Sequence, residues 1–114
     1  MEKIGYNIER GLFCEERVVE YFLALGFLLV GRRVRTPFAE IDILFRDLKG
    51  RLVLVEVKSV LSFDYLPARM GPRQKRRLLR ALEYFLARGE LARLEFAVVS
   101  QEGAVLCVPD VFSS

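Results

Sequence analysis

Residues 51–58, RLVLVEVK, form a nearly continuous apolar run that is rich in valine. A strand that alternates apolar and polar side chains is covered on one face, whereas an uninterrupted apolar strand is covered on both. The run therefore predicts a central strand with a layer on each side. Residues 8–25 and 72–88 suit those layers as helices, because apolar side chains recur in them at three- and four-residue spacing.

The other expected elements complete a mixed sheet. Gly26 ends the first helix, Gly89 ends the second, and Pro72 suits the first turn of the second. The expected strands are one that begins at 27–30, then 40–46, 51–58, 95–100 and 104–108, with Pro109 stopping the last. The order α-β-β-β-α-β-β predicts an α/β fold with a mixed central β-sheet flanked by helices. The 114 residues fit one domain, 1–114.

Composition removes several classes of protein. The chain has no histidine and only two cysteines, so the ligands of a Cys/His zinc site and the base of a Ser-His-Asp triad are missing. Cys14 and Cys107 are expected to be buried, reduced thiols of a cytoplasmic protein. The longest apolar run, 21–30, is too short to span a bilayer, and the first ten residues carry acids where a signal peptide needs an apolar region. We therefore expect no membrane partner.

Charged residues inside the apolar strands carry the functional information, because burying a charge is costly unless it is paired or binds an ion. Glu56 and Lys58 are two residues apart in one strand, so their side chains share a face. Asp42 lies in the preceding strand, and a hairpin turn at 47–50 joins the two. Counting back from this turn places Asp42 opposite Val55, one residue short of Glu56, unless a bulge or a slip in the turn shifts the pairing.

Two carboxylates and an ammonium group at strand ends suit a hard divalent cation. Mg²⁺, or Mn²⁺, would take oxygen ligands from Asp42, Glu56 and the Val57 carbonyl, together with phosphate oxygens of a substrate. Lys58 would orient a water molecule or stabilise charge on the phosphate. The other interpretation is structural: Glu56 would pair with Lys58, and Asp42 with an arginine.

Glu15 is the fourth candidate of this site. At 100° per residue, four apolar side chains fall within about 60° of it: Ile8, Leu12, Val19 and Phe22. Glu15 should therefore lie in the middle of the buried face of the first helix, whereas Glu16 points about 100° away. From that face Glu15 would reach the strand-end carboxylates.

Basic residues form two clusters that suit a nucleic-acid backbone, although the net charge is only +3. The candidate contacts are Arg32, Arg33, Arg35, Arg69, Arg73, Lys75, Arg76 and Arg77. A solvated helix face is the other explanation of the second cluster. Tyr6, Tyr21, Phe63, Tyr65 and Tyr84 are aromatic candidates for stacking on bases, with Phe63 and Tyr65 favoured because they lie in a loop.

Several of these motifs occur together in a known family. The motifs are EE-x4-YF-x3-GF at 15–27, EID at 40–42, VEVK at 55–58, PRQKRRL at 72–78 and A-x2-YFL at 81–86. The segment that contains them resembles the YraN-like family of small bacterial proteins with the PD-(D/E)xK, restriction-endonuclease-like fold. It is also similar to archaeal Holliday-junction resolvases in the acid of its first helix and its D…E-x-K layout. Arg33 stands where the YraN-like family often has asparagine.

The resemblance implies that Glu15, Asp42, Glu56 and Lys58 form the active-site set. In the resolvase case it also implies a homodimer. The leading hypothesis is thus a metal-dependent endonuclease acting on DNA, with branched and single-stranded DNA as candidate substrates. Two alternatives stay open: a non-catalytic nucleic-acid-binding module that keeps the fold, and a protein-interaction subunit that docks through its apolar tail, residues 105–112.

Overall fold

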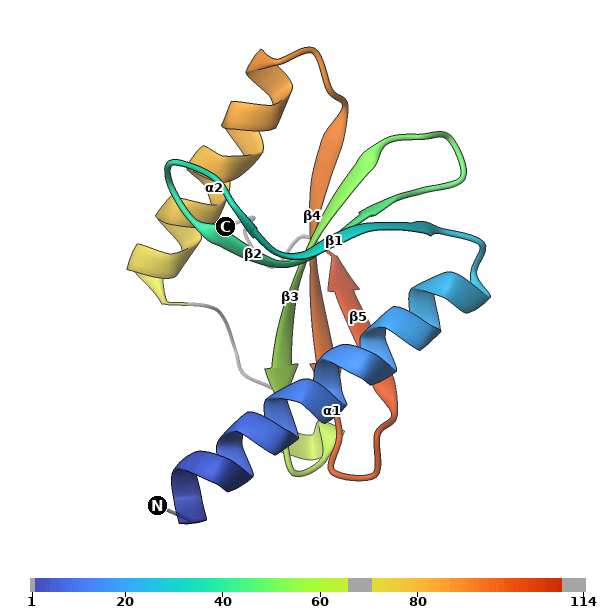
Figure 1. Ribbon diagram of the computed structural model, residues 1–114, viewed down its shortest axis with the longest axis vertical. Helices are drawn as coiled ribbons and strands as arrows, with labels where there is room; N and C mark the ends of the chain where they lie inside the picture. The colour runs from blue at the N-terminus through green and yellow to red at the C-terminus, as the bar shows by residue number, and fades with distance from the viewer. Residues whose placement is uncertain (1, 66–70, 110–114) are drawn as a thin grey trace.

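The computed structural model describes residues 2–65 and 71–109, with two helices, a short 3₁₀ turn and five strands (Figure 1). The elements are α1 (Glu2–Ala24), β1 (Leu28–Arg35), β2 (Glu40–Arg46), β3 (Leu52–Ser59), η1 (Phe63–Tyr65), α2 (Pro72–Ala87), β4 (Ala92–Val99) and β5 (Val105–Pro109). The predicted α/β class and the order of helices and strands are confirmed. Arg69 and residues 110–112 of the predicted docking tail lie outside the described residues.

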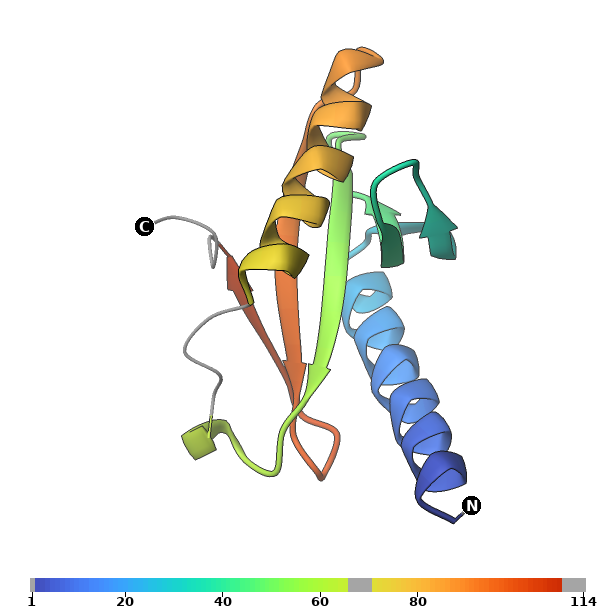
Figure 2. The same ribbon diagram turned by 90° about the vertical axis from the view of Figure 1, so that its left-hand side faces the viewer.

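The five strands form one mixed sheet with the spatial order β1-β2-β3-β4-β5. All neighbours are antiparallel except β3 and β4, which are parallel and connected through α2. Figure 2 shows α1 and α2 on opposite faces of this sheet. Val53 and Val55 of β3 pack in the α1-side core, while Leu52 and Leu54 pack in the α2-side core. The valine-rich run is thus a central strand that is covered on both faces, as predicted.

Several element boundaries differ from those predicted. β1 continues through its arginines to Arg35, and most of its side chains are exposed. An edge strand of this kind needs no apolar alternation, because it pairs on one side only and packs little. β4 begins three residues before Glu95, and Pro109 pairs opposite Glu95 as the last residue of β5. A proline at a strand end removes no needed ladder donor.

The apolar stripe predicted for α1 is only partly correct. Val19 and Phe22 are buried together with Cys14 and Val18. Ile8, however, is 58% exposed and Leu12 is 50% exposed. Figure 2 shows the reason, because the N-terminal end of α1 extends away from the sheet. Glu15 is 8% exposed, so its predicted burial is confirmed. It lies near the N-terminal limit of the buried stretch and not in its middle.

The observed register between β2 and β3 differs by one residue from the predicted register. Ile43, and not Asp42, lies opposite Val55. The Asp47 N–H donates to the Arg51 carbonyl oxygen, so the connection between the strands is three residues long. Its third residue, Gly50, has a φ of +80°, a left-handed conformation that glycine adopts without a Cβ clash. This extra residue is the slip in the turn that brings Asp42 level with Glu56.

The predicted burial holds for Cys14 but only partly for Cys107. Cys14 is a buried free thiol and Cys107 is a half-buried one. Burial raises the pKa of the Cys107 thiol to about 11. Neither of the described helices is long and apolar enough to cross a membrane.

Candidate metal and phosphate site

The candidate site lies where β2 separates from β3. The antiparallel pairing of these strands runs from Arg46 to Ile43 and is not continued to Asp42. Beyond that point the Val57 N–H donates instead to Oδ2 of Asp42, at 2.9 Å. β2 meanwhile stays paired with β1 as far as Glu40. The sheet therefore opens between its second and third strands, and the Asp42 carboxylate occupies the opening.

Asp42 and Glu56 converge in this opening, as the sequence predicted. The Asp42 N–H donates to Oε1 of Glu56 at 3.3 Å, and Nε2 of Gln74 on α2 donates to Oε2 of Glu56 at 3.2 Å. Burial raises the pKa of Asp42. Burial, and then the negative charge of Asp42, raises the pKa of Glu56 to about 7. The negative charge of Asp42 therefore opposes ionisation of Glu56 in a partly dehydrated position, while a hydrogen bond with Glu56 lowers the pKa of Asp42.

Neither carboxylate is neutralised by an ion pair within the described residues. The ion pairs predicted by the structural interpretation, Glu56 with Lys58 and Asp42 with an arginine, are not formed there. Lys58 and Arg33 act from further away and lower the pKa values of Glu56 and Asp42, respectively. A buried carboxylate beside a half-buried one, with this deficit of positive charge, fits the oxygen donor set of a divalent cation.

Glu15 approaches the same site from the other face of the sheet. Burial raises the pKa of Glu15, the Arg33 guanidinium lowers it, and Asp42 raises it further. Nη2 of Arg33 lies 3.4 Å from Oε2 of Glu15. Arg33 is a non-glycine residue at a positive φ of 51°, a conformation in which asparagine is enriched. Glu16 is exposed and pairs with Arg32, as its predicted orientation requires.

A pocket of about 140 Å³ adjoins Glu56. It is lined by Ala39, Glu40, Glu56, Gln74, Arg77 and Leu78. Sequence reasoning named only Glu56 and Arg77 among these as site residues and missed Gln74. The available signal was the helical spacing of Gln74 and Leu78, which places both on the buried side of α2. Lys58 is exposed on the same face of β3 as Glu56.

The predicted nucleic-acid contacts fall into two groups. Arg32, Arg33 and Arg35 of β1 each lie within 4.0 Å of a carboxylate: Glu16, Glu15 and Glu40, respectively. On α2, a second pocket of about 400 Å³ is lined by Arg73, Arg76, Arg77 and Arg80.

The arginine pocket of α2 includes one arginine that the sequence analysis did not name as a contact and does not include the predicted Lys75. Arg80 belongs to the arginine pocket. Lys75 is half-buried and lies about 200° around the helix from Arg73, so it does not share that face. Phe63 is half-buried and packs against the α2-side core, and the Tyr65 side chain lies outside the described residues.

No group of three or more Asp, Glu or Cys side chains gathers at a spacing suited to a metal ion in the part of the chain that the structure describes. Asp42 and Glu56 remain a pair of side-chain donors, which a main-chain carbonyl, water and phosphate oxygens would have to complete. This donor set is typical of Mg²⁺ bound together with a phosphate substrate.

The fold and these contacts define a mixed α/β protein whose sheet opens around a carboxylate pair, with Glu56 buried and Asp42 half-buried. The sequence pattern of the Uncharacterised protein family UPF0102 matches residues 14–100, and the chain belongs to this family. The assignment confirms the YraN-like resemblance.

Individual relatives agree with this assignment. A UPF0102 protein of Granulibacter bethesdensis is 36% identical over 90% of this chain and 67% of its own length. A UPF0102 protein of Ralstonia nicotianae is 36% identical over 82% of this chain and 77% of its own length. A UPF0102 protein of Thermus thermophilus is 39% identical over 79% of this chain and 82% of its own length.

Proposed function

We propose that this protein is a divalent-metal-dependent nuclease that hydrolyses phosphodiester bonds in DNA. The observation that carries the proposal is the Asp42–Glu56 pair, in which a half-buried and a buried carboxylate lie side by side without an ion pair among the described residues. A structural role would be better served by a neutral or ion-paired group, because an unpaired buried charge destabilises the fold. A function that supplies a cation explains why both acids are present.

The protein groups that would hold Mg²⁺ or Mn²⁺ are the Asp42 and Glu56 carboxylates and the Val57 carbonyl oxygen. The Val57 N–H already donates to Asp42, which fixes the orientation of that carboxylate. The Gln74 amide does the same for Glu56. When bound, the ion would polarise the phosphoryl group of the substrate and favour attack by water.

The remaining residues of the site act on the substrate and on charge. Lys58 is exposed beside Glu56 and would donate to a phosphate oxygen as negative charge develops there. Glu15 would hold a water molecule at the site, and the ion pair with Arg33 would set the position of the Glu15 carboxylate. The arginines of α2 would neutralise backbone phosphates next to the reacting one. In this proposal the protein works as a homodimer, which light scattering of the purified chain would test.

The decisive experiment is a cleavage panel of linear, flapped, single-stranded and four-way DNA with Mg²⁺ or Mn²⁺. Asp42→Asn and Lys58→Ala are each expected to lower the cleavage rate at least 100-fold and to leave DNA binding largely intact. Asp64→Asn and Lys49→Ala replace exposed residues of the same types and should cleave like the wild type. Equal cleavage by wild type, Asp42→Asn and Lys58→Ala would refute the assignment of the site.

The non-catalytic alternative makes a different prediction. Isothermal titration should show Mg²⁺ or Mn²⁺ binding that is lost in Asp42→Asn if the carboxylate pair is a metal site. DNA binding without any cation binding or cleavage would favour a non-catalytic module that keeps this fold. A requirement for a co-expressed partner protein would favour an interaction subunit instead.

A further inference from the structure

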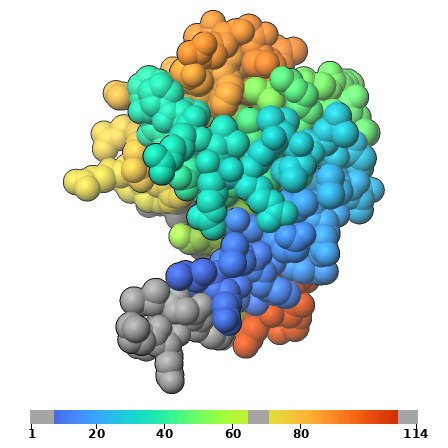
Figure 3. Space-filling view, in the orientation of Figure 1, coloured from blue at the N-terminus to red at the C-terminus, as the bar shows by residue number. Residues whose placement is uncertain are grey.

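Three pockets lie in a row along one side of α2, and neighbouring pockets share a lining residue. The pocket beside Glu56 shares Arg77 with the arginine pocket, and the arginine pocket shares Arg80 with a third one. The third pocket lies under the loop between β1 and β2. Figure 3 shows this β1–β2 segment, in teal, beside α2, in yellow to orange, on one face of the molecule. The carboxylate site is thus connected to the third pocket by a continuous arginine-lined surface.

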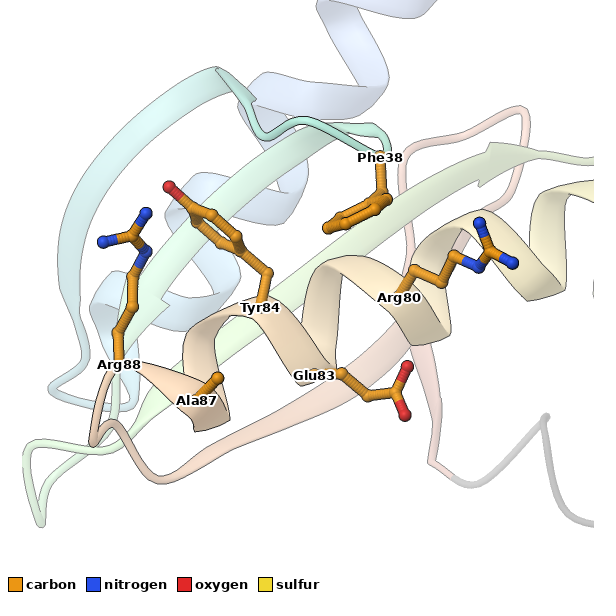
Figure 4. A pocket seen from close by; sticks show the side chains of 6 residues that line it. All are labelled: Phe38, Arg80, Glu83, Tyr84, Ala87 and Arg88. Atoms are coloured by element: carbon orange, nitrogen blue, oxygen red, sulfur yellow. The ribbon is translucent and has the colours of Figure 1, made fainter.

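The third pocket has an aromatic interior and basic sides. It measures about 460 Å³ and is lined by Phe38, Arg80, Glu83, Tyr84, Ala87 and Arg88. The ring centroids of Phe38 and Tyr84 are 6.4 Å apart, with an angle of 69° between the planes. The Arg88 guanidinium lies over the Tyr84 ring at 4.2 Å. In Figure 4 the two rings approach each other above α2, while the Glu83 carboxylate points away from them.

These groups match the chemistry of a nucleotide. Exposed aromatic rings stack on bases of any sequence, and arginines neutralise the adjoining phosphates. Phe38 is 41% exposed although it is a large apolar side chain, so a stacking face is available. The volume lies within the range of roughly 300–1,000 Å³ that is usual for small-ligand sites. A wholly apolar ligand would leave the arginine rim without a partner.

The spacing along α2 suits one strand of nucleic acid. Tyr84 lies ten residues after Gln74, which is about 15 Å along a helix that rises 1.5 Å per residue. Successive phosphates of one strand advance about 3.4 Å in stacked B-form DNA. The aromatic pocket is therefore about four stacked nucleotides, or fewer extended ones, from the carboxylate pair.

We propose that the pocket lined by Phe38 and Tyr84 binds an unpaired base, stacked on the exposed Phe38 ring, of the DNA whose backbone crosses the α2 arginines. A base within a duplex would first have to leave its stack, which costs free energy, so the pocket selects single-stranded or flapped DNA. This inference rests on the proposed nuclease function for the role of the carboxylate site. It adds the substrate class, a DNA with a single-stranded segment, and two residues that recognise it.

The test is DNA binding in EDTA, where metal-dependent cleavage does not interfere. Fluorescence anisotropy should show that the wild type binds a labelled single-stranded oligonucleotide more tightly than a duplex of equal length. Phe38→Ala should weaken single-strand binding by about fivefold to a hundredfold, the range for loss of one stacked base, and leave duplex binding unchanged. Phe38→Tyr should bind like the wild type because it keeps a ring at the same place.

Two comparisons separate stacking from a general loss of structure. Phe13→Ala removes a ring that is also 41% exposed, but on α1, and should leave single-strand binding unchanged. An oligonucleotide of abasic sites should bind equally to wild type and Phe38→Ala, because it has no base to stack. The proposal is overturned if the wild type does not prefer single strands, or if Phe38→Ala and wild type bind the normal oligonucleotide equally.

The outcomes for the pocket and for the nuclease proposal are distinguishable. Single-strand binding that depends on Phe38, without cleavage under any metal condition, would support the pocket and refute the proposed nuclease activity. Metal-dependent cleavage that is lost in Asp42→Asn, together with binding that is unchanged in Phe38→Ala, would support the nuclease and refute the pocket.

Discussion

Replacing Glu56 with glutamine is expected to stabilise the metal-free protein at alkaline pH and to leave its stability nearly unchanged at pH 4.5. Burial and the neighbouring Asp42 raise the pKa of Glu56 from 4.5 to about 7. Well below pH 4.5 the carboxyl group is neutral in both the folded and the unfolded chain, and at pH 4.5 only the unfolded chain is partly ionised. Between 4.5 and 7 the unfolded chain loses its proton first, so stability falls as pH rises, and above 7 the full cost is present. Glutamine is neutral throughout and avoids this loss.

The size of the effect follows from the pKa and the contacts of the side chain. At 1.36 kcal/mol per unit, a rise from 4.5 to about 7 corresponds to roughly 3 kcal/mol. Glutamine keeps one oxygen to accept the Asp42 N–H, and the Gln74 amide can turn to present its own oxygen to the new NH₂ group. Imperfect hydrogen bonds would remove about 1 kcal/mol. The expected gain is therefore about 1–3 kcal/mol at pH 8.5 and under about 0.5 kcal/mol at pH 4.5.

Urea unfolding in EDTA, followed by circular dichroism at both pH values, measures this difference. With a typical slope of about 2 kcal/mol per molar urea, the midpoint of Glu56→Gln should exceed that of the wild type by about 0.5–1.5 M at pH 8.5. Glu102→Gln, in the exposed turn before β5, should shift stability by no more than about 0.5 kcal/mol at either pH. Mg²⁺ should stabilise the wild type at pH 8.5 more than it stabilises Glu56→Gln.

The reasoning fails if Glu56→Gln is no more stable than the wild type at pH 8.5. It also fails if the gain is equally large at pH 4.5, because an effect of charge must disappear when the carboxyl group is protonated. In either case Glu56 would not be held in the folded protein against an electrostatic cost, and the main argument for a cation at this position would be lost.

Two further predictions concern the scaffold. In urea unfolding, Gly103→Ala should destabilise the fold by about 2 kcal/mol and Gly50→Ala by about 1 kcal/mol. Both glycines have a positive φ, but of the two only Gly103 would bring an added Cβ against a side chain, that of Phe13 at 2.9 Å. Equal losses of stability would refute the packing argument. Asp47→Asn should be less stable than the wild type at pH 7, and this deficit should shrink below about pH 4. Burial raises the pKa of Asp47, but the hydrogen bonds from Arg93 and Arg51 together outweigh that effect and hold the pKa below its ordinary 3.8. A deficit in thermal unfolding that does not change with pH would contradict this.

The layered fold was predictable because its strongest signals are local. The apolar run that became β3 and the periodic segments that became α1 and α2 each depend on neighbouring residues. The extent of β1 was not predictable in the same way. Its arginines lie in the strand because β2 supplies the backbone pairing, while their side chains reach exposed positions beside carboxylates of α1 and β2. An edge strand carries little hydrophobic pattern from which its length can be read.

The site was predictable as a set of residue types but not as a set of contacts. The alignment of Asp42 with Glu56 depends on the left-handed conformation of Gly50, a single residue of turn geometry. The contacts of Gln74 and Arg80 depend on how α2 lies across the sheet, and sequence alone does not fix that placement. Local patterns therefore identified the acids, and long-range packing decided which neighbours they have.

Asp42 and Asp47 show why packing matters for assigning function. They lie five residues apart. Asp42 is within β2 and half-buried, and Asp47 directly follows β2 and is buried. Asp47 receives the guanidinium groups of Arg51 and Arg93 at 2.8 and 2.7 Å. Asp42 receives a main-chain N–H and lies beside a second carboxylate. Since Arg93 is 46 residues from Asp47, only the folded chain shows that Asp47 is ion-paired, whereas Asp42 has no ion pair among the residues that the structure describes. That difference, more than the E-x-K motif, distinguishes a candidate functional acid from a structural one in this protein.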